Sequence, residues 1–439
     1  MKKVLTVLVF HACAVVFPLL AQEALPLSLE EALNTALKNN REIAMASLDE
    51  QRADATFKQT NAVFLPQIRV SYTAMGSNNP LNAFGFKLQQ QSIAPSDFNP
   101  ELLNNPSSTQ NFLTKAEWHQ PLLNMDMLYM RRAVDEQRAV YAFKSKRTRE
   151  YLTFEVRKAY AQLHLAHQAK NVLEEALQMV NAMYKATNNR FEKGFLQKSD
   201  VLNVQVQVST TERQLAEAVS NVRNASDYLS LLMGVNAGAV YTVNGVAELQ
   251  YAENVDALLP QNRADFQALK SAISAQDQMI QSGKMSYLPK LNGFAEYMIN
   301  DNEALGFGSD SYLVGAQLSW TLFNGMATRS TIHQQRIDRD KLTHQLVQQK
   351  EQGQIELNKT LRQEQDARLS LQQYDTAVEQ AAEALRILQN RYQQGLVTTN
   401  DVLQSQTSLS QQKLNRAQAV FTINTTRSYL QFLTSTTEQ

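Results

Sequence analysis

Glycine, proline and cysteine are scarce in this chain of 439 residues, and neither sign of charge prevails. It holds 14 glycines and 10 prolines, each about half or less of the usual shares of ~7% and ~5%. Forty-two basic residues balance 42 acidic ones, which argues against a nucleic-acid-binding protein, because such proteins normally carry a basic surface. So few helix-breaking residues in so long a chain indicate long helices.

No long apolar run occurs beyond the N-terminus, so we expect no transmembrane helix. Residues 1–21 are typical of a signal peptide, with Lys2 and Lys3 before an apolar stretch and Ala21 as a plausible last residue before cleavage. The only cysteine, Cys13, lies inside this segment. We therefore predict an exported mature chain without disulfides or thiol chemistry.

Two stretches of the chain repeat at a constant offset of 201 residues, as from Asn189 to Asn390. Both read Arg-aromatic-x-x-Gly-x-x-x-x-x-Asp-Val-Leu. The glycine is expected to end an incoming helix at positive φ, and Ser199-Asp200 and Asn400-Asp401 to supply N-cap oxygens to the outgoing one. We predict helix–turn–helix tips at about 188–200 and 389–401. A duplicated tip implies duplicated units, predicted here as residues 22–234 and 254–439 with a linker at 235–253.

Alternating polar and apolar residues predict two strands in each repeat. The first strand of each pair follows a Leu-Pro junction, and the four lie at about 67–76, 111–121, 290–299 and 312–322. Each approaches the ~10 residues of a tilted membrane strand. Trp118 and Trp320 fall near strand ends, where an aromatic girdle would lie. Two ordinary soluble hairpins with core tryptophans are the alternative.

Residues 77–110 connect the first pair of strands and hold four of the ten prolines, at positions 80, 95, 100 and 106. This is the least helical part of the mature sequence, and we expect a surface loop there.

Heptad-spaced apolar residues predict long coiled-coil helices. The spans are a short capped helix from Ser28, then 41–64, 126–189 and 200–233, with 264–287, 326–389 and 401–434 in the second repeat. At ~1.5 Å per residue the helix at 126–189 is about 96 Å long, and those at 200–233 and 41–64, placed end to end, reach about 87 Å. Two shorter helices can therefore accompany one long helix in each repeat.

Four strands cannot close a barrel, and four thin helices cannot bury a core of globular size. Both shortfalls are solved if several copies contribute strands to one barrel and helices to one cylinder. We predict a mostly α fold with a membrane β-barrel portion, internally duplicated.

The duplicated helix–strand–strand–helix halves, the Leu-Pro junctions and the tip motif together resemble the TolC family of outer-membrane efflux proteins over essentially the whole mature chain. The resemblance implies a homotrimer with a 12-stranded barrel in outer-membrane lipid and a 12-helix periplasmic tunnel. It also implies a passive duct opened by a periplasmic adaptor protein and an inner-membrane pump, with no enzyme activity and no cofactor. We predict that the duct exports small molecules.

Site residues carry over from the family by position. Asp200 and Asp401 match positions at the periplasmic constriction, where acidic rings favour cations, although N-capping alone would also explain them. Tyr392 matches a tyrosine that helps to latch the closed tip. Some members have an arginine where this chain has Val397, and a second aspartate where it has Gln404. The adaptor-contacting motif matches Gly194-Phe195-Leu196 and Gly395-Leu396-Val397, which turn packing alone would also explain.

Three alternatives stay open from the sequence. The duct could export proteins through a type I secretion system rather than small molecules. The chain could be a periplasmic adaptor or another structural coiled coil, which would explain the heptads but not the paired strands. His164 and His167, i and i+3 on a helix, could hold a metal ion, but no third ligand is evident. No phosphate loop, nucleophile elbow or metalloprotease motif is present.

Overall fold

The computed structural model describes residues 25–243 and 258–436. The predicted signal peptide, most of the predicted linker and residues 254–257 lie outside the described residues. The chain divides into two compact units. The sheet unit holds residues 42–148 and 258–355, and the tip unit holds residues 25–41, 149–243 and 356–434. Helices α5 (Met125–Glu192) and α8 (Ala327–Gln393) have residues in both.

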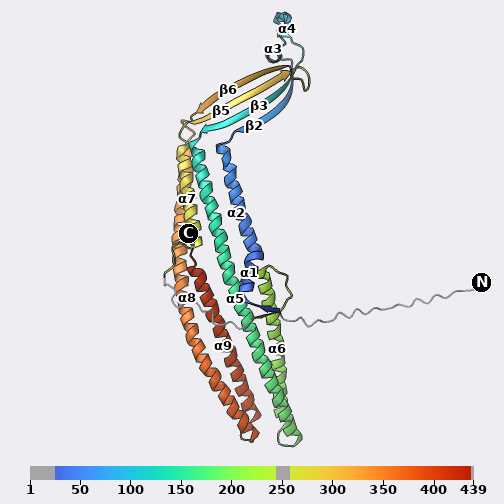
Figure 1. Ribbon diagram of the computed structural model, residues 1–439, viewed down its shortest axis with the longest axis vertical. Helices are drawn as coiled ribbons and strands as arrows, with labels where there is room; N and C mark the ends of the chain where they lie inside the picture. The colour runs from blue at the N-terminus through green and yellow to red at the C-terminus, as the bar shows by residue number, and fades with distance from the viewer. Residues whose placement is uncertain (1–24, 244–257, 437–439) are drawn as a thin grey trace, which may run out of the picture. The chain divides into compact units, whose positions relative to one another are not determined.

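The sheet unit is built on four antiparallel strands in the order β2-β3-β5-β6 (Figure 1). These are β2 (Gln67–Ser77), β3 (Thr109–Leu123), β5 (Lys290–Asp301) and β6 (Ser309–Ser319). Successive strands pair along most of their length, with one irregularity between Pro121 and Leu123. Among the strands that the structure describes, β2 and β6 each have a hydrogen-bonded neighbour on one side only.

The two faces of this sheet differ in polarity, as the period-2 pattern predicts. Cross-strand partners share a face. One row therefore runs Ile68–Trp118–Ala295–Val314 and the next Val70–Ala116–Tyr297–Tyr312. The opposite face carries the row Arg69–Glu117–Glu296–Leu313 and, beside it, Lys115. Lys115 Nζ lies 2.7 Å from Glu117 and 3.0 Å from Glu296.

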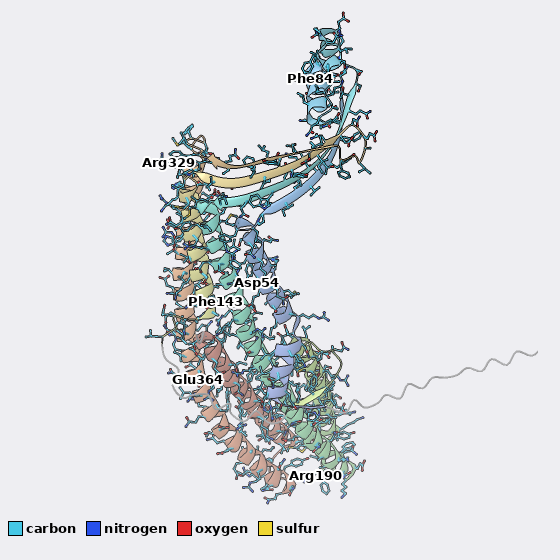
Figure 2. The ribbon with its side chains drawn as sticks, turned by 45° about the horizontal axis from the view of Figure 1, so that its top comes forward. Asp54, Phe84, Phe143, Arg190, Arg329 and Glu364 are labelled. Carbon is cyan, nitrogen blue, oxygen red and sulfur yellow. The ribbon has the colours of Figure 1, made fainter. Side chains whose placement is uncertain are left out.

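The connection between β2 and β3 is more helical than the sequence indicated. It contains α3 (Pro80–Gln89), the short 3-10 helix η2 (Pro95–Phe98) and α4 (Pro100–Asn104). Each begins with a proline, because a first helical residue needs no backbone N–H donor and proline's fixed φ suits it. Phe84, labelled in Figure 2, packs edge-on against Phe98, and Lys87 pairs with Asp97 at 2.6 Å. The expectation of a surface loop missed these helices, because the prolines start helices rather than exclude them.

Helices α2 (Arg41–Gln59) and α7 (Ala264–Met285) precede the two hairpins, and η1 (Thr60–Val63) extends the first of them. Arg131 of α5 lies over the Phe57 ring at 4.3 Å and donates to the Thr60 hydroxyl at 2.8 Å. Lys290, which begins β5, pairs with Asp126 of α5 at 2.5 Å. None of the helices in the described ranges combines the length and hydrophobicity needed to cross a membrane.

The tip unit consists mainly of two helical hairpins. Helix α5 turns into α6 (Lys198–Met233), and α8 turns into α9 (Thr399–Thr434). Helix α1 (Leu29–Asn39) begins with a capping box between Ser28 and Glu31. Strands β1 (Leu25–Leu27) and β4 (Tyr241–Val243) form a short parallel pair.

Side-chain contacts in the tip unit repeat at the same 201-residue offset as the sequence. The Tyr228 hydroxyl donates to Glu155 at 3.3 Å, and the Tyr429 hydroxyl donates to Glu356 at 2.9 Å. The equivalence of the two hairpins therefore extends from their motifs to the bonds that join their helices.

Candidate functional site

The two hairpin tips have the same backbone geometry. Gly194 has a φ of 78° and Gly395 a φ of 75°, in the left-handed region that favours glycine. At the first tip the Gly194 N–H bonds the Phe191 carbonyl at 2.8 Å and the Phe195 N–H bonds the Arg190 carbonyl at 2.9 Å. Equivalent bonds close the second tip, from Gly395 to Tyr392 and from Leu396 to Arg391, both at 3.0 Å. Both helices thus end in a Schellman motif, as the sequence predicted for the glycines.

Asp200 and Asp401 occupy the third helical position rather than the N-cap. Asp200 accepts a bond from the Gln197 N–H at 3.1 Å. Asp401 accepts bonds from the Thr398 N–H at 2.8 Å and the Thr398 hydroxyl at 2.7 Å. The prediction that Ser199-Asp200 and Asn400-Asp401 supply the N-cap oxygens was therefore wrong. The helices begin earlier, because an acid at the third position closes a capping box on the residue three before it.

Asp401 is exposed, whereas Asp200 is half-buried. The bonds from the Thr398 hydroxyl and then the Thr398 N–H hold the pKa of Asp401 below its usual value. Hydrogen bonds to the charged form of an acid favour that form. Asp401 therefore carries a full negative charge at neutral pH.

Tyr392 lies in the interior of the tip unit and is only 6% exposed. It belongs to an apolar cluster with Leu385, Val402 and Leu409. Its hydroxyl lies 3.3 Å from the Thr187 hydroxyl and accepts a 3.3 Å bond from Thr399. The tyrosine therefore ties α5, α8 and α9 together within one chain.

Arg190, labelled in Figure 2, covers the Tyr392 ring. Its guanidinium carbon lies 4.4 Å from the ring centre, and its nitrogens donate to the carbonyls of Tyr392 at 3.0 Å and Gln393 at 3.3 Å. We call this set of contacts between the two tips the Arg190 clasp. The sequence shows that the arginine is duplicated. It does not show that Arg190 contacts the other repeat, because the offset between repeats does not reveal which surfaces meet.

A cavity of about 240 Å³ lies beside the Arg190 clasp, between α5, α8 and α9. Met179, Met183 and Gln406 contribute to its lining. The packing around the Arg190 clasp therefore leaves a gap between the two tips.

The residues expected to contact an adaptor protein differ in how far their side chains are exposed. Phe195 is 75% exposed and Leu396 is 64% exposed. Leu196 is half-buried, and so is Val397, which packs against the cluster around Tyr392. Gly194 and Gly395 are exposed at the turns. The turn of each tip thus exposes a large apolar side chain, Phe195 in the first and Leu396 in the second.

The two tryptophans lie in different local settings. Trp118 is inside β3, on the apolar face between Ile68 and Ala295. Trp320 follows the last residue of β6, is 61% exposed, and donates its ring N–H to the Tyr287 carbonyl at 2.9 Å. The predicted strand at 312–322 runs too far, because β6 lies at Ser309–Ser319.

His164 and His167 lie in different local environments within the tip unit. The His167 ring bonds the Tyr241 carbonyl at 2.8 Å, and burial lowers the pKa of His164, with a smaller contribution from His167. Among the residues that the structure describes, no group of three or more side chains is placed to hold a metal ion.

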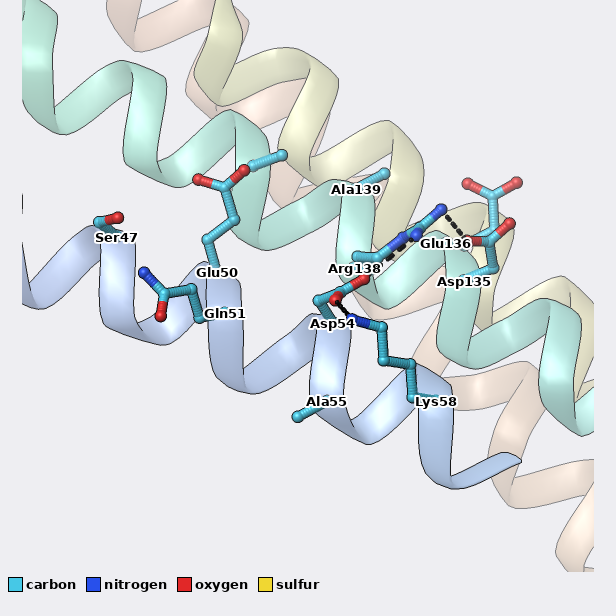
Figure 3. Close-up of a pocket in the computed structure, with 11 residues that line it drawn as sticks. Ser47, Glu50, Gln51, Asp54, Ala55, Lys58, Asp135, Glu136, Arg138 and Ala139 are labelled. Carbon is cyan, nitrogen blue, oxygen red and sulfur yellow. Dashed lines mark hydrogen bonds and ion pairs between the residues drawn. The ribbon is translucent and has the colours of Figure 1, made fainter. Parts of the chain in front are cut away.

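A groove of about 910 Å³ lies between α2 and α5 in the sheet unit (Figure 3). Four of its charged side chains form ion pairs with one another: Asp54 contacts Lys58 at 2.6 Å and Arg138 at 3.4 Å, and Arg138 also contacts Asp135 at 2.7 Å. The bond from Lys58, followed by that from Arg138, lowers the pKa of Asp54. These pairs are typical of a solvated helix face rather than of a reaction centre.

Several solved structures of other proteins have the same fold as this chain. Crystal structures of CusC match with a TM-score of 0.80 and 16% identity, covering 93% of this chain and 92% of that one. A membrane protein from Pseudomonas aeruginosa matches with a TM-score of 0.80, 17% identity and 93% coverage of each chain. The Campylobacter jejuni CmeC outer membrane channel matches with a TM-score of 0.76 and 15% identity, covering 92% and 85%. At these identities the matches establish a shared fold.

No curated protein sequence is significantly similar to the chain. The sequence model of one family, the outer membrane efflux proteins, matches residues 32–235 and 257–435. These segments contain both tips, all four strands of the large sheet and the helices that join them. The chain is therefore a member of the outer membrane efflux protein family.

Proposed function

We propose that the chain assembles as a homotrimer into the exit duct of a tripartite efflux system for small molecules. A periplasmic adaptor protein and an inner-membrane pump would open this duct and supply the energy. The observation that carries the proposal is the four-stranded sheet, which has one apolar face, one polar face and, within the described part of the chain, an unpaired edge on each side. Lipid cannot satisfy free strand edges, so a membrane sheet must close, and four strands are too few to do so alone.

The two tips support the part of this proposal that concerns the adaptor protein. Phe195 and Leu396 are large apolar side chains exposed at the turns, which a soluble partner could cover. The substrate class rests on membership of a family of efflux proteins. Loss of the gene should raise sensitivity to small toxic compounds, and a defect confined to protein secretion would contradict this substrate class.

We further propose that Asp401, and beside it Asp200, forms an acidic ring at the periplasmic constriction. Asp401 is exposed and remains charged because of its bonds to Thr398. Three copies of each acid around one opening would favour cations. Tyr392 contributes to closure by holding the second tip against α5 through Thr187.

Single-channel recording in planar bilayers tests the acidic ring. Asp401→Asn keeps an oxygen for the cap but removes the charge, so we expect larger current steps and at least a twofold loss of cation preference. In the unmodified channel, cation preference should persist on acidification through about pH 4, the usual range of aspartate, and disappear only below it, because the pKa of Asp401 is lowered.

The matched control is Glu31→Gln, since Glu31 is also the third-position acid of a capping box, in α1. This variant should leave selectivity unchanged. Equal effects of the two substitutions, or none from Asp401→Asn, would contradict the acidic ring and leave Asp401 as a helix cap.

A further inference from the structure

The Arg190 clasp joins the first tip to the second within one chain. The residues at the equivalent positions of the other repeat make no such contact with any residue that the structure describes. At the 201-residue offset Arg190 corresponds to Arg391, and Tyr392 corresponds to Phe191. Among the described residues, the Arg391 guanidinium makes no hydrogen bond, ion pair or ring contact. Phe191 is 36% exposed, against 6% for Tyr392.

We propose that Arg391 of one protomer clasps Phe191 of the next, so that every seam between tips in the assembled ring carries the same arginine–aromatic contact. This inference rests on the trimer proposed above. In a ring of three duplicated chains, first and second tips alternate, so each second tip must meet the first tip of a neighbour. The neighbour's tip is therefore a second copy of a surface that the single chain already binds.

The expected geometry follows from the clasp within the chain. Arg190 lies 4.4 Å from its ring and donates to the carbonyls of Tyr392 and Gln393. By the same offset, Arg391 would stack on the partner's Phe191 and donate to the carbonyls of the partner's Phe191 and the partner's Glu192. Both carbonyls lie at the end of α5, where cationic side chains are stabilised by the helix dipole.

A second contact of the clasp also has a chemically matched counterpart at the proposed seam. Within the chain, the Tyr392 hydroxyl meets the Thr187 hydroxyl. The equivalent positions hold Phe191 and Leu388, so both polar groups are replaced by apolar ones. A phenylalanine facing a leucine leaves no unpaired hydroxyl in a buried seam, whereas a change at one position alone would leave a polar group without a partner.

Exposure in the single chain points to the same surface. Gln406 is buried beside the cavity that α5 also lines, whereas its equivalent Gln205 is exposed. Leu403 is half-buried, whereas its equivalent Leu202 is 49% exposed. On the second hairpin this face is covered by the same chain. On the first hairpin the equivalent face is exposed, as expected if a neighbouring chain covers it in the trimer.

Thiol crosslinking tests this contact directly. Cys13, the only native cysteine, is first replaced by Cys13→Ser. Arg391→Cys with Glu192→Cys places thiols at the proposed seam between chains. Arg190→Cys with Gln393→Cys is the matched pair at the observed seam within a chain, and both pairs are treated with the same short bifunctional methanethiosulfonate. Light scattering before treatment gives the oligomeric state.

We expect covalent dimers and trimers on non-reducing denaturing gels from the Arg391/Glu192 pair, and only chain-sized, internally linked protein from the Arg190/Gln393 pair. Neither Arg391→Cys nor Glu192→Cys alone should give a ladder. A trimeric preparation in which the Arg391/Glu192 pair stays monomeric on the gel, or links within one chain, overturns the inference and leaves the proposed duct intact. A preparation without trimers overturns both.

A cysteine-free measurement covers the case in which the thiol variants fail to assemble. Arg391→Ala and Phe191→Ala should each lower the temperature at which trimers dissociate in detergent, and the double variant should lower it no further than the stronger single one. Arg190→Ala should loosen the tip without this coupling to Phe191. Additive effects of Arg391→Ala and Phe191→Ala would show that the two side chains do not meet.

Discussion

Single residues set the shape of the tips through backbone conformation. Gly194 and Gly395 adopt positive φ, and a Cβ added at either would meet no atom within 4 Å. Replacement by alanine would therefore cost backbone strain and nothing else, roughly 1–2 kcal/mol per residue for the left-handed conformation.

We expect Gly194→Ala and Gly395→Ala each to speed amide hydrogen exchange in the first turn of the following helix, by up to about tenfold per 1.4 kcal/mol lost. Gly85→Ala in α3 is the control, because its Cβ also meets open space but its φ is not positive. That variant should be neutral or slightly stabilising, since glycine inside a helix costs about 0.5–1 kcal/mol relative to alanine. Equal exchange rates in all three variants would contradict a strained turn.

Local sequence rules located the tips but not the roles of their acids. Glycine at a helix end has one dominant explanation, so the positive φ at Gly194 could be predicted. An aspartate near a helix start can serve either as the N-cap or as the third residue of a capping box, and Asp401 is the latter. The contact between Arg190 and Tyr392 could not be predicted, because it joins residues 202 positions apart across the two repeats.

At the scale of elements, the sheet was predictable wherever one face had to be apolar. The alternation puts Ile68 and Val70 on the same face of the sheet. A shift of one residue in the strand register would move both side chains to the opposite face, so the pattern determines which face is apolar. The end of β6 was less predictable, since Trp320 continues the alternation but lies beyond the last paired residue, Ser319. Prolines marked the β2–β3 connection as non-strand, yet composition alone did not reveal that Pro80 and Pro100 begin helices.

The polarity of the two faces makes a sharp prediction for adjacent residues of β6. Val314 lies on the apolar face and Leu313 on the polar face, opposite Glu296, in the middle of the strand. Val314→Arg should destabilise the folded protein in lipid vesicles by about 2–4 kcal/mol, the cost of arginine on a lipid-facing strand at mid-depth. Urea titration of the vesicle-inserted protein measures this.

Leu313→Arg is the matched control, because it introduces the same side chain one residue away and at nearly the same depth. Its guanidinium would lie beside Glu296 on the polar face, so its effect should be within about 1 kcal/mol of the unmodified protein. The reverse order of the two effects would mean that the polar face, not the apolar one, contacts lipid.

At the scale of the whole molecule, three copies of the polar face would line one channel. Each copy brings Lys115 between Glu117 and Glu296, with Arg69 in the same row as the two acids. The two basic and two acidic groups balance, so such a barrel would add little charge preference of its own. Selectivity would then come from the acids at the tips, in a different part of the chain from the barrel.

Lys115→Met removes one positive charge from each chain and leaves Glu117 and Glu296 without their shared cation. We expect the barrel to become a second cation-selective region, because a ring of uncompensated acids attracts cations along the pore. The change is best measured as the reversal potential in a salt gradient, in an Asp401→Asn background where the tip no longer dominates selectivity. The shift should be toward cations and should shrink at high salt, since screening shortens the reach of fixed charges.

Lys87→Met is the control for this experiment, because Lys87 also forms an ion pair but lies in α3, outside the strands. It should leave the reversal potential near that of the Asp401→Asn background. A shift from Lys87→Met as large as that from Lys115→Met would mean that the permeation path follows the β2–β3 connection as closely as the polar face. No shift from Lys115→Met, in a channel that still conducts, would mean that the polar face does not line the path, and the three-copy barrel would then need a different arrangement of its faces.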